Sequence, residues 1–157
     1  MKKINDEAPA IRVKEVDGSD NVIGMAAPKL QLIVTVETME EGAKKELISH
    51  IINNYQEHPK VQLIMVKSGE CDSTECKSKD YFRVVYDSQN TFIGKYFKSI
   101  AEHFKGGLVL IDLEGSILYI AEFTDGLQGC IQRLDSVVAE ASKEKKGSHN
   151  HENWMRA

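Results

Sequence analysis

Residues 30–66 read LQLIVTVETMEEGAKKELISHIINNYQEHPKVQLIMV, and this stretch decides the fold. Its two ends, residues 30–36 and 61–66, are short and nearly continuous apolar runs, which is typical of strands covered on both faces. Apolar residues at steps of three and four predict one face of a helix between them: Leu47, Ile48, Ile51, Ile52 and Tyr55. Pro59 disfavours helix for the residue before it, so the helix should end there. The stretch therefore predicts a strand, a helix and a second strand.

The flanking segments on the amino-terminal side predict a hairpin. Residues 11–16 alternate apolar and polar side chains, as a half-buried strand does. The turn signal at Asp17 and Gly18 then leads into residues 21–25, which can return as the second arm.

The carboxyl-terminal side predicts a short strand over residues 82–86, a helix, a second hairpin and a last helix. Asp87 and Ser88 can cap the first of these helices. Its inner face would hold Phe92, Ile93, Tyr96, Phe97 and Ile100. Gly106 and Gly107 interrupt the pattern before strand 108–111, and residues 112–115 form a turn into strand 117–120.

The last helix is predicted from about residue 125 to residue 142. Its apolar period is carried by Leu127, Ile131, Leu134 and Val138, with Cys130 on the same face. The whole order predicts an α/β domain of the thioredoxin-like plan over residues 1–142, with helices on both faces of a central mixed sheet. Residues 143–157 are polar and are interpreted as a mobile tail.

Composition excludes several classes of function. The chain has 157 residues, 20 basic and 24 acidic side chains and a net charge of −4, so it offers no basic field to a nucleic acid. No apolar run approaches the ~18 residues that span a bilayer. Acidic residues stand where the apolar core of a signal peptide would follow the first lysines, so a cytoplasmic protein is expected.

The three cysteines are too few for a disulfide framework, so the question is whether any is reactive. Cys71 and Cys76 lie in a polar segment and could form a redox pair if their loop folds back; the alternative is two loop thiols. Acidic neighbours of both residues disfavour the thiolate. A zinc site from these cysteines and His149 and His151 is a weaker hypothesis, because the spacing is not that of a paired knuckle.

The other nucleophile and base candidates have simpler explanations. Cys130 lies on an apolar helix face and is interpreted as a small core residue. His50, His58 and His103 have no identifiable serine or cysteine partner in the sequence, so no catalytic triad is assigned.

Several motifs together resemble the peroxiredoxins, and within them the atypical two-cysteine thiol peroxidases. Residues 8–11 (APAI) are similar to the family's opening Ala-Pro-x-Phe. Residues 82–87 (FRVVYD) and 91–97 (TFIGKYF) resemble its short strand ending in Ser-Asp and its Phe-Gly-x-x-Tyr helix. Residues 108–119 (LVLIDLEGSILY) are similar to its pattern Val-x-Val-Ile-Asp-x-x-Gly-x-Val-x-Tyr. The resemblance covers residues 4–141 and implies a thioredoxin fold, an antioxidant redox activity without a cofactor, and a homodimer.

The catalytic motif of that family is not repeated in this sequence. In the family, the strand equivalent to residues 30–36 leads to Thr-x-x-Cys at a helix start, where the helix dipole lowers the thiol pKa. The corresponding residues 36–44 read VETMEEGAK, which puts Met39 at the threonine and Gly42 at the peroxidatic cysteine. The family's active-site arginine falls on Gly106, with Lys105 adjacent. The resemblance thus implies a degenerate site.

Two functional hypotheses follow, and they leave open whether the chain is an enzyme. The first is a thiol peroxidase-like protein that has lost peroxidatic activity and acts as a non-catalytic or regulatory member. The alternative is an oxidoreductase that reduces hydroperoxides or disulfides through Cys71 and Cys76, since Cys76 falls in the segment of the family's resolving cysteine. The expected partners are a second copy, a thioredoxin-type reductant or another peroxiredoxin; neither nucleic acid nor membrane is expected.

Overall fold

The elements follow the predicted order. The computed structural model describes residues 2–36, 41–68, 83–87, 89–97, 105–123 and 127–148. Their helices and strands are β1 (Ile11–Glu15), β2 (Asp20–Ile23), β3 (Leu30–Val36), α1 (Glu41–Tyr55), β4 (Val61–Ser68), β5 (Arg83–Asp87), α2 (Thr91–Tyr96), β6 (Gly106–Ile111), β7 (Ile117–Glu122) and α3 (Leu127–Ser148). Met39, Cys71, Cys76 and the two tail histidines lie outside the described residues.

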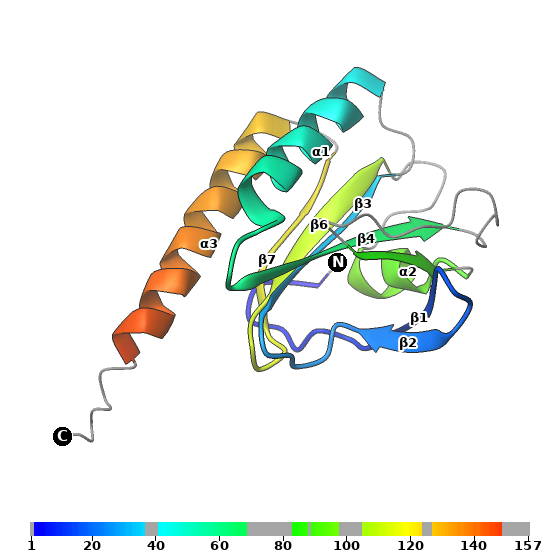
Figure 1. Cartoon of the computed structure of the whole chain (residues 1–157), viewed down its shortest axis with the longest axis horizontal. Coiled ribbons are helices and arrows are strands. Elements are labelled where there is room, and N and C mark those ends of the chain that lie inside the picture. Colours follow the sequence, from blue (N-terminus) through cyan, green and yellow to red (C-terminus); the bar gives the residue numbers. More distant parts are fainter. Residues whose placement is uncertain are drawn as a thin grey trace.

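The strands form one mixed sheet in the order β2-β1-β5-β4-β3-β6-β7. The three central strands β5, β4 and β3 are parallel, whereas β1, β6 and β7 each run antiparallel to their neighbours. The prediction of a thioredoxin-like mixed sheet is therefore confirmed. Figure 1 shows β1 and β2 at one side of the sheet and β6 and β7 toward the other.

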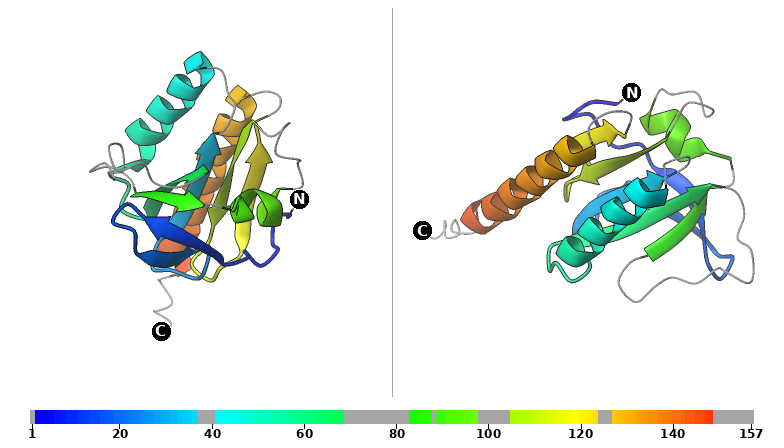
Figure 2. Two further views of the ribbon diagram at one scale, coloured as in Figure 1. Left: turned by 90° about the vertical axis from the view of Figure 1, so that its right-hand side faces the viewer. Right: turned by 90° about the horizontal axis from the view of Figure 1, so that it is seen from above.

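Helices cover both faces of this sheet, as predicted. α1 and α3 lie side by side on one face, and α2 lies on the other (Figures 1 and 2). Successive residues of β3 belong to the two cores: Leu32 and Val34 pack in the cluster under α1 and α3, and Ile33 packs with α2. All three are fully buried, which agrees with the interpretation of residues 30–36 as a strand covered on both faces.

α2 is shorter than the sequence predicts. The helix ends at Tyr96, and Phe97 has an extended backbone with φ −118° and ψ 146°. Phe97 is nonetheless buried and packs its ring edge-on against Phe92, with ring centroids 5.6 Å apart. Leaving the helix at this point lets Phe97 fill the core beside β6, and this gain outweighs another helical turn.

Gly106 and Gly107 are strand residues, although the sequence predicts a break there. Gly107 pairs with Thr35 and Gly106 with Val36, so β6 begins two residues earlier than predicted. A Cβ on Gly107 would lie 2.7 Å from Cζ of Phe97, so the missing side chain is what admits that ring. Gly107 therefore serves packing between β6 and Phe97.

α3 extends to Ser148, so residues 143–148 are helical where the sequence predicts the beginning of a tail. Lysine and glutamate are good helix formers, and they continue a helix already anchored by buried Ile131, Leu134 and Val138. Within the ranges that the structure describes, no helix combines the length and apolar character that a membrane crossing requires.

Candidate functional site

The carboxyl ends of the parallel strands meet at one edge of the sheet. β3 ends at Val36, β4 ends at Ser68, and β5 ends at Asp87, which pairs with Ser68. The antiparallel β6 begins at the same edge, because Gly106 pairs with Val36. Sites in α/β sheets gather at such an edge, where loops and helix starts face one another.

α1 begins at this edge with Glu41, and Gly42 lies in its first turn. Gly42 is exposed, and a Cβ built on it would meet no atom of the described residues within 4 Å. Packing therefore does not require a glycine at this position, and a larger side chain could stand there. The structure thus places at the start of α1 the residue that the resemblance aligns with the peroxidatic cysteine, and that residue carries no reactive group.

The entry to β6 supplies no buried cation to the same edge. Gly106 is buried with φ 150°, and Lys105 before it is exposed. The resemblance aligns the family's arginine with Gly106. Glycine has no side chain that could carry a positive charge at that position. Among the described residues of this edge, an anion such as a thiolate at the start of α1 would be stabilised by the backbone amides of the helix start.

Asp87 is the polar side chain that orders the start of α2. Its carboxylate oxygens accept hydrogen bonds from the backbone amides of Thr91 (3.0 Å) and Phe92 (2.7 Å), and the side chain is buried. The prediction that Asp87 caps this helix is confirmed. The residue at the helix boundary is Asn90, in the left-handed region with φ 54°.

Cys130 is a half-buried free thiol near the start of α3, and it packs against the core between the sheet and the helix pair. Its neighbour is Tyr119 on β7. Burial, and then the charge and hydrogen bond of Cys130, raise the pKa of Tyr119 to about 12, while the charge of Arg133 acts in the opposite direction. The interpretation of Cys130 as a residue of the apolar face agrees with this packing.

A polar network that the sequence did not reveal joins α1 to α3. His50 Nε2 lies 3.0 Å from Oδ2 of Asp135, and the Tyr55 hydroxyl donates a hydrogen bond to Oδ1 of the same carboxylate. Tyr55 is buried, whereas the other two side chains are partly exposed. Because 85 residues separate His50 from Asp135, no local pattern could have paired them. We interpret the network as a link between the helices.

Replacing Tyr55 with phenylalanine is expected to lower the free energy of unfolding by about 1 kcal/mol, because the hydrogen bond to Asp135 is lost. Burial, then the hydrogen bond to Asp135 and its charge, raise the pKa of Tyr55 above the usual 10.0. The unfolded chain releases this proton first, so the stabilisation is complete below about pH 10 and decreases as pH rises further. Chemical denaturation at about pH 8 and about pH 11 measures both effects. If the free energy of unfolding fell equally between these two pH values for the variant and for the original chain, this account would be contradicted.

Among the residues that the structure describes, no three histidine, cysteine, aspartate or glutamate side chains gather as a metal site. The zinc hypothesis rests on Cys71, Cys76, His149 and His151, which lie outside those residues. The same holds for the proposed redox pair. The described part of the edge therefore consists of the start of α1, the ends of β3, β4 and β5, and the glycines of β6.

Comparison with known proteins identifies the fold. Neither a protein-family model nor a curated protein sequence matches this chain. A peroxiredoxin-like protein from Aquifex aeolicus superposes with a TM-score of 0.62 at 17% identity, covering 87% of this chain and 88% of the other. A thiol peroxidase from Chromobacterium violaceum gives a TM-score of 0.65 at 11% identity, covering 90% and 89%.

A thioredoxin-like oxidoreductase structure agrees over the same length. A protein assigned as the thiol:disulfide interchange protein DsbE from Chlorobium tepidum gives a TM-score of 0.68 at 12% identity, covering 90% of this chain and 99% of the other. The chain has the thioredoxin-like fold. That fold is shared by peroxiredoxins and thiol-disulfide oxidoreductases, so the reaction has to be argued from the site itself.

Proposed function

We propose that this protein is a thiol peroxidase-like member of the thioredoxin fold that works without a peroxidatic thiol, as a non-catalytic or regulatory member. The single observation that carries the proposal is Gly42 in the first turn of α1. Peroxide reduction on this fold needs a thiolate that attacks one peroxide oxygen, and glycine has no side chain to supply it. All three cysteines of the chain come after residue 70.

Two further features support a site without thiol chemistry. The chain has no proline after Pro59, so none stands at the start of β6. A thioredoxin-type reductase would be expected to have a proline there, and its absence argues against that class of enzyme. Glu41 precedes Gly42 in the sequence, and an acidic neighbour would raise the pKa of a thiol placed at residue 42. At the positions that the resemblance aligns with the peroxidatic cysteine and the arginine, this chain therefore has Gly42 and Gly106.

The test is hydroperoxide consumption by the full chain with dithiothreitol as reductant. We expect the same rate from the original chain and from a variant with Cys71→Ser, Cys76→Ser and Cys130→Ala, because the proposal assigns peroxide chemistry to none of these thiols. The far-ultraviolet spectra of both proteins serve as the folding control. A rate at least about tenfold higher for the original chain, which is about 1.4 kcal/mol of barrier, would refute the proposal.

A second candidate is an oxidoreductase that uses Cys71 and Cys76. In its favour, β4 ends at Ser68 on the edge where α1 begins, and Cys71 follows three residues later in the sequence. In the reaction, both thiols would be oxidised to one disulfide while a substrate disulfide is reduced to two thiols. Loss of this exchange in Cys76→Ser, with Cys130→Ala unaffected, would establish it.

A regulatory role requires a partner, and we propose either a second copy of the chain or an active peroxiredoxin. The proposal rests on the family resemblance, in which dimers form through the face that bears the first helix. Sedimentation velocity distinguishes the two cases: a dimer of the purified chain supports self-association, and a monomer that shifts only with an added peroxiredoxin supports the mixed assembly.

A further inference from the structure

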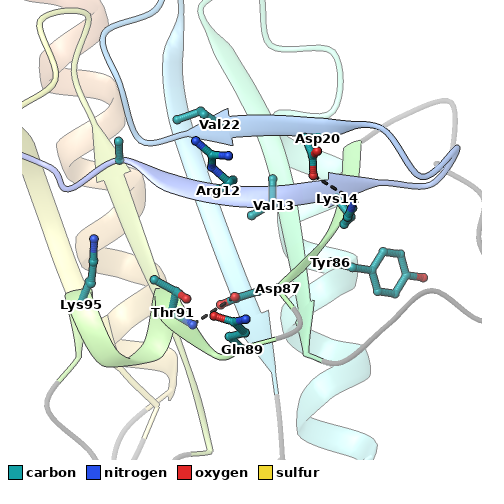
Figure 3. A pocket seen from close by; sticks show the side chains of 11 residues that line it. Arg12, Val13, Lys14, Asp20, Val22, Tyr86, Asp87, Gln89, Thr91 and Lys95 are labelled. Atoms are coloured by element: carbon teal, nitrogen blue, oxygen red, sulfur yellow. Dashed lines mark hydrogen bonds and ion pairs between the residues drawn. The ribbon is translucent and has the colours of Figure 1, made fainter.

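A hollow of about 470 Å³ lies between the amino-terminal hairpin, the end of β5 and α2 (Figure 3). We call it the hairpin pocket. Its charged side chains are Arg12, Lys14, Asp20, Asp87 and Lys95, and Tyr86 and Thr91 also line it and carry hydroxyl groups. Its volume falls in the range of about 300–1,000 Å³ that is typical of small-molecule sites.

The hollow exists because β1 separates from β5. The two strands pair only at Lys14 with Tyr86 and at Glu15 with Val85. Toward its amino end β1 is held instead by α2, through a hydrogen bond of 2.6 Å from the Tyr96 hydroxyl to the carbonyl of Pro9. Between these two attachments the hairpin and α2 stand apart, and the hollow lies in this gap.

Both carboxylates of the pocket already have partners. Asp20 forms an ion pair of 2.9 Å with Lys14, and buried Asp87 accepts hydrogen bonds from two amides at the start of α2. Within the described ranges, Arg12 and Lys95 form no ion pair. Both cations line the hollow. The hydrogen bond and charge of Lys14 lower the pKa of the Asp20 carboxyl, and Arg12 lies near enough for its positive charge to lower that pKa further.

The arrangement suits an anion that can be held from two sides. Arg12 belongs to β1 and Lys95 to α2, so the two cations come from different elements that line the hollow (Figure 3). A guanidinium binds two oxygens of one oxyanion in a fork, whereas a lysine ammonium acts as a point charge. A carboxylate would have both its oxygens occupied by Arg12. A phosphate group keeps a third terminal oxygen for Lys95 or for the Thr91 hydroxyl.

We propose that the hairpin pocket binds a phosphate group, either free or on a small organic molecule, between Arg12 and Lys95. The pocket is separate from the proposed function at α1 and does not depend on it. Glycerol phosphate, inorganic phosphate and glycerate serve as probes, because glycerate offers a carboxylate on the same carbon skeleton. Each is titrated into the full chain at constant ionic strength, and backbone amide NMR shifts are followed.

We expect saturable shifts at the amides of the pocket residues, with a dissociation constant of about 1 mM or below for glycerol phosphate. Arg12→Gln and Lys95→Gln should each weaken binding at least about fivefold, which is about 1 kcal/mol. Lys29→Gln is the matched control, because Lys29 is exposed and lies outside the pocket. Dispersed amide spectra of the variants verify that they fold.

The arms of the experiment separate the sources of the phosphate. Tighter binding of glycerol phosphate than of inorganic phosphate assigns the pocket to a phosphorylated molecule, and equal binding assigns it to the free ion. Glycerate that binds as tightly as glycerol phosphate would overturn the phosphate assignment. Shifts that fail to saturate, or that Lys29→Gln weakens as much as Arg12→Gln, would overturn the site itself.

Discussion

Replacing Gly42 with cysteine is expected to produce a thiol whose pKa lies about 1 unit below that of an exposed thiol in the middle of the same helix. Gly42 stands in the first turn of α1, where unpaired backbone amides and the helix dipole favour an anion. The position has room for the side chain, because an added Cβ meets no atom of the described residues within 4 Å. At neutral pH this shift makes alkylation by iodoacetamide about tenfold faster.

The matched control is Ser49→Cys, which places the thiol at an exposed position near the middle of α1. Alkylation rates are measured against pH and read on the peptide that carries each new cysteine, so the native cysteines remain in place. Adding Glu41→Gln to Gly42→Cys should lower the thiol pKa further, because a like charge next to the thiolate is removed. Equal pKa values for the two new thiols would show that this helix start does not favour a thiolate.

Even an activated thiol at residue 42 is not expected to restore the full rate of a peroxiredoxin. Transition-state stabilisation needs donors and charge around the reacting oxygens as well as a nucleophile. The described part of the edge offers an exposed Lys105 and a buried Gly106 where the resemblance implies arginine. We therefore expect Gly42→Cys to react slowly with peroxide although it is alkylated fast. That result would indicate that the cation implied by the resemblance is missing at the entry to β6.

The sequence predicted the fold well because the fold depends on local patterns. The apolar runs at residues 30–36 and 61–66 became parallel neighbours β3 and β4, and β3 has the predicted bounds. The period of α1 placed Leu47, Ile51 and Tyr55 in the core. These segments can each bury their apolar residues in only one way, so spacing alone specifies them.

The features that the sequence did not predict depend on contacts between distant segments. Phe97 leaves α2 because Gly107 on β6 leaves room for its ring, and neither residue alone signals this. The hairpin pocket depends on where β1 separates from β5; the alternation of residues 11–16 showed only that Arg12 and Lys14 share a face. At the candidate site, the resemblance supplied the position of Gly42, and Cys71 and Cys76 remain predictions.

Replacing Gly107 with alanine is expected to lower the free energy of unfolding by about 2 kcal/mol, because it overpacks the core beside β6. The new Cβ would stand 2.7 Å from Cζ and 2.8 Å from Cε1 of Phe97, and 2.9 Å from the carbonyl oxygen of Ala121. The ring is buried and the carbonyl belongs to β7, so neither can move aside freely. Urea denaturation measures the change.

Gly94→Ala is the matched control for this prediction, and its effect should have the opposite sign. Gly94 is an exposed residue of α2 with no atom near an added Cβ, so alanine should stabilise the helix by about 0.5–1 kcal/mol.

Phe97→Leu should cost less stability in the Gly107→Ala chain than in the original chain, by about 1 kcal/mol of coupling, because the shorter side chain relieves the contact. Additive losses would mean that Phe97 does not occupy the space above Gly107. In that case Gly107 would need another explanation than packing, and the early end of α2 would lose its physical cause.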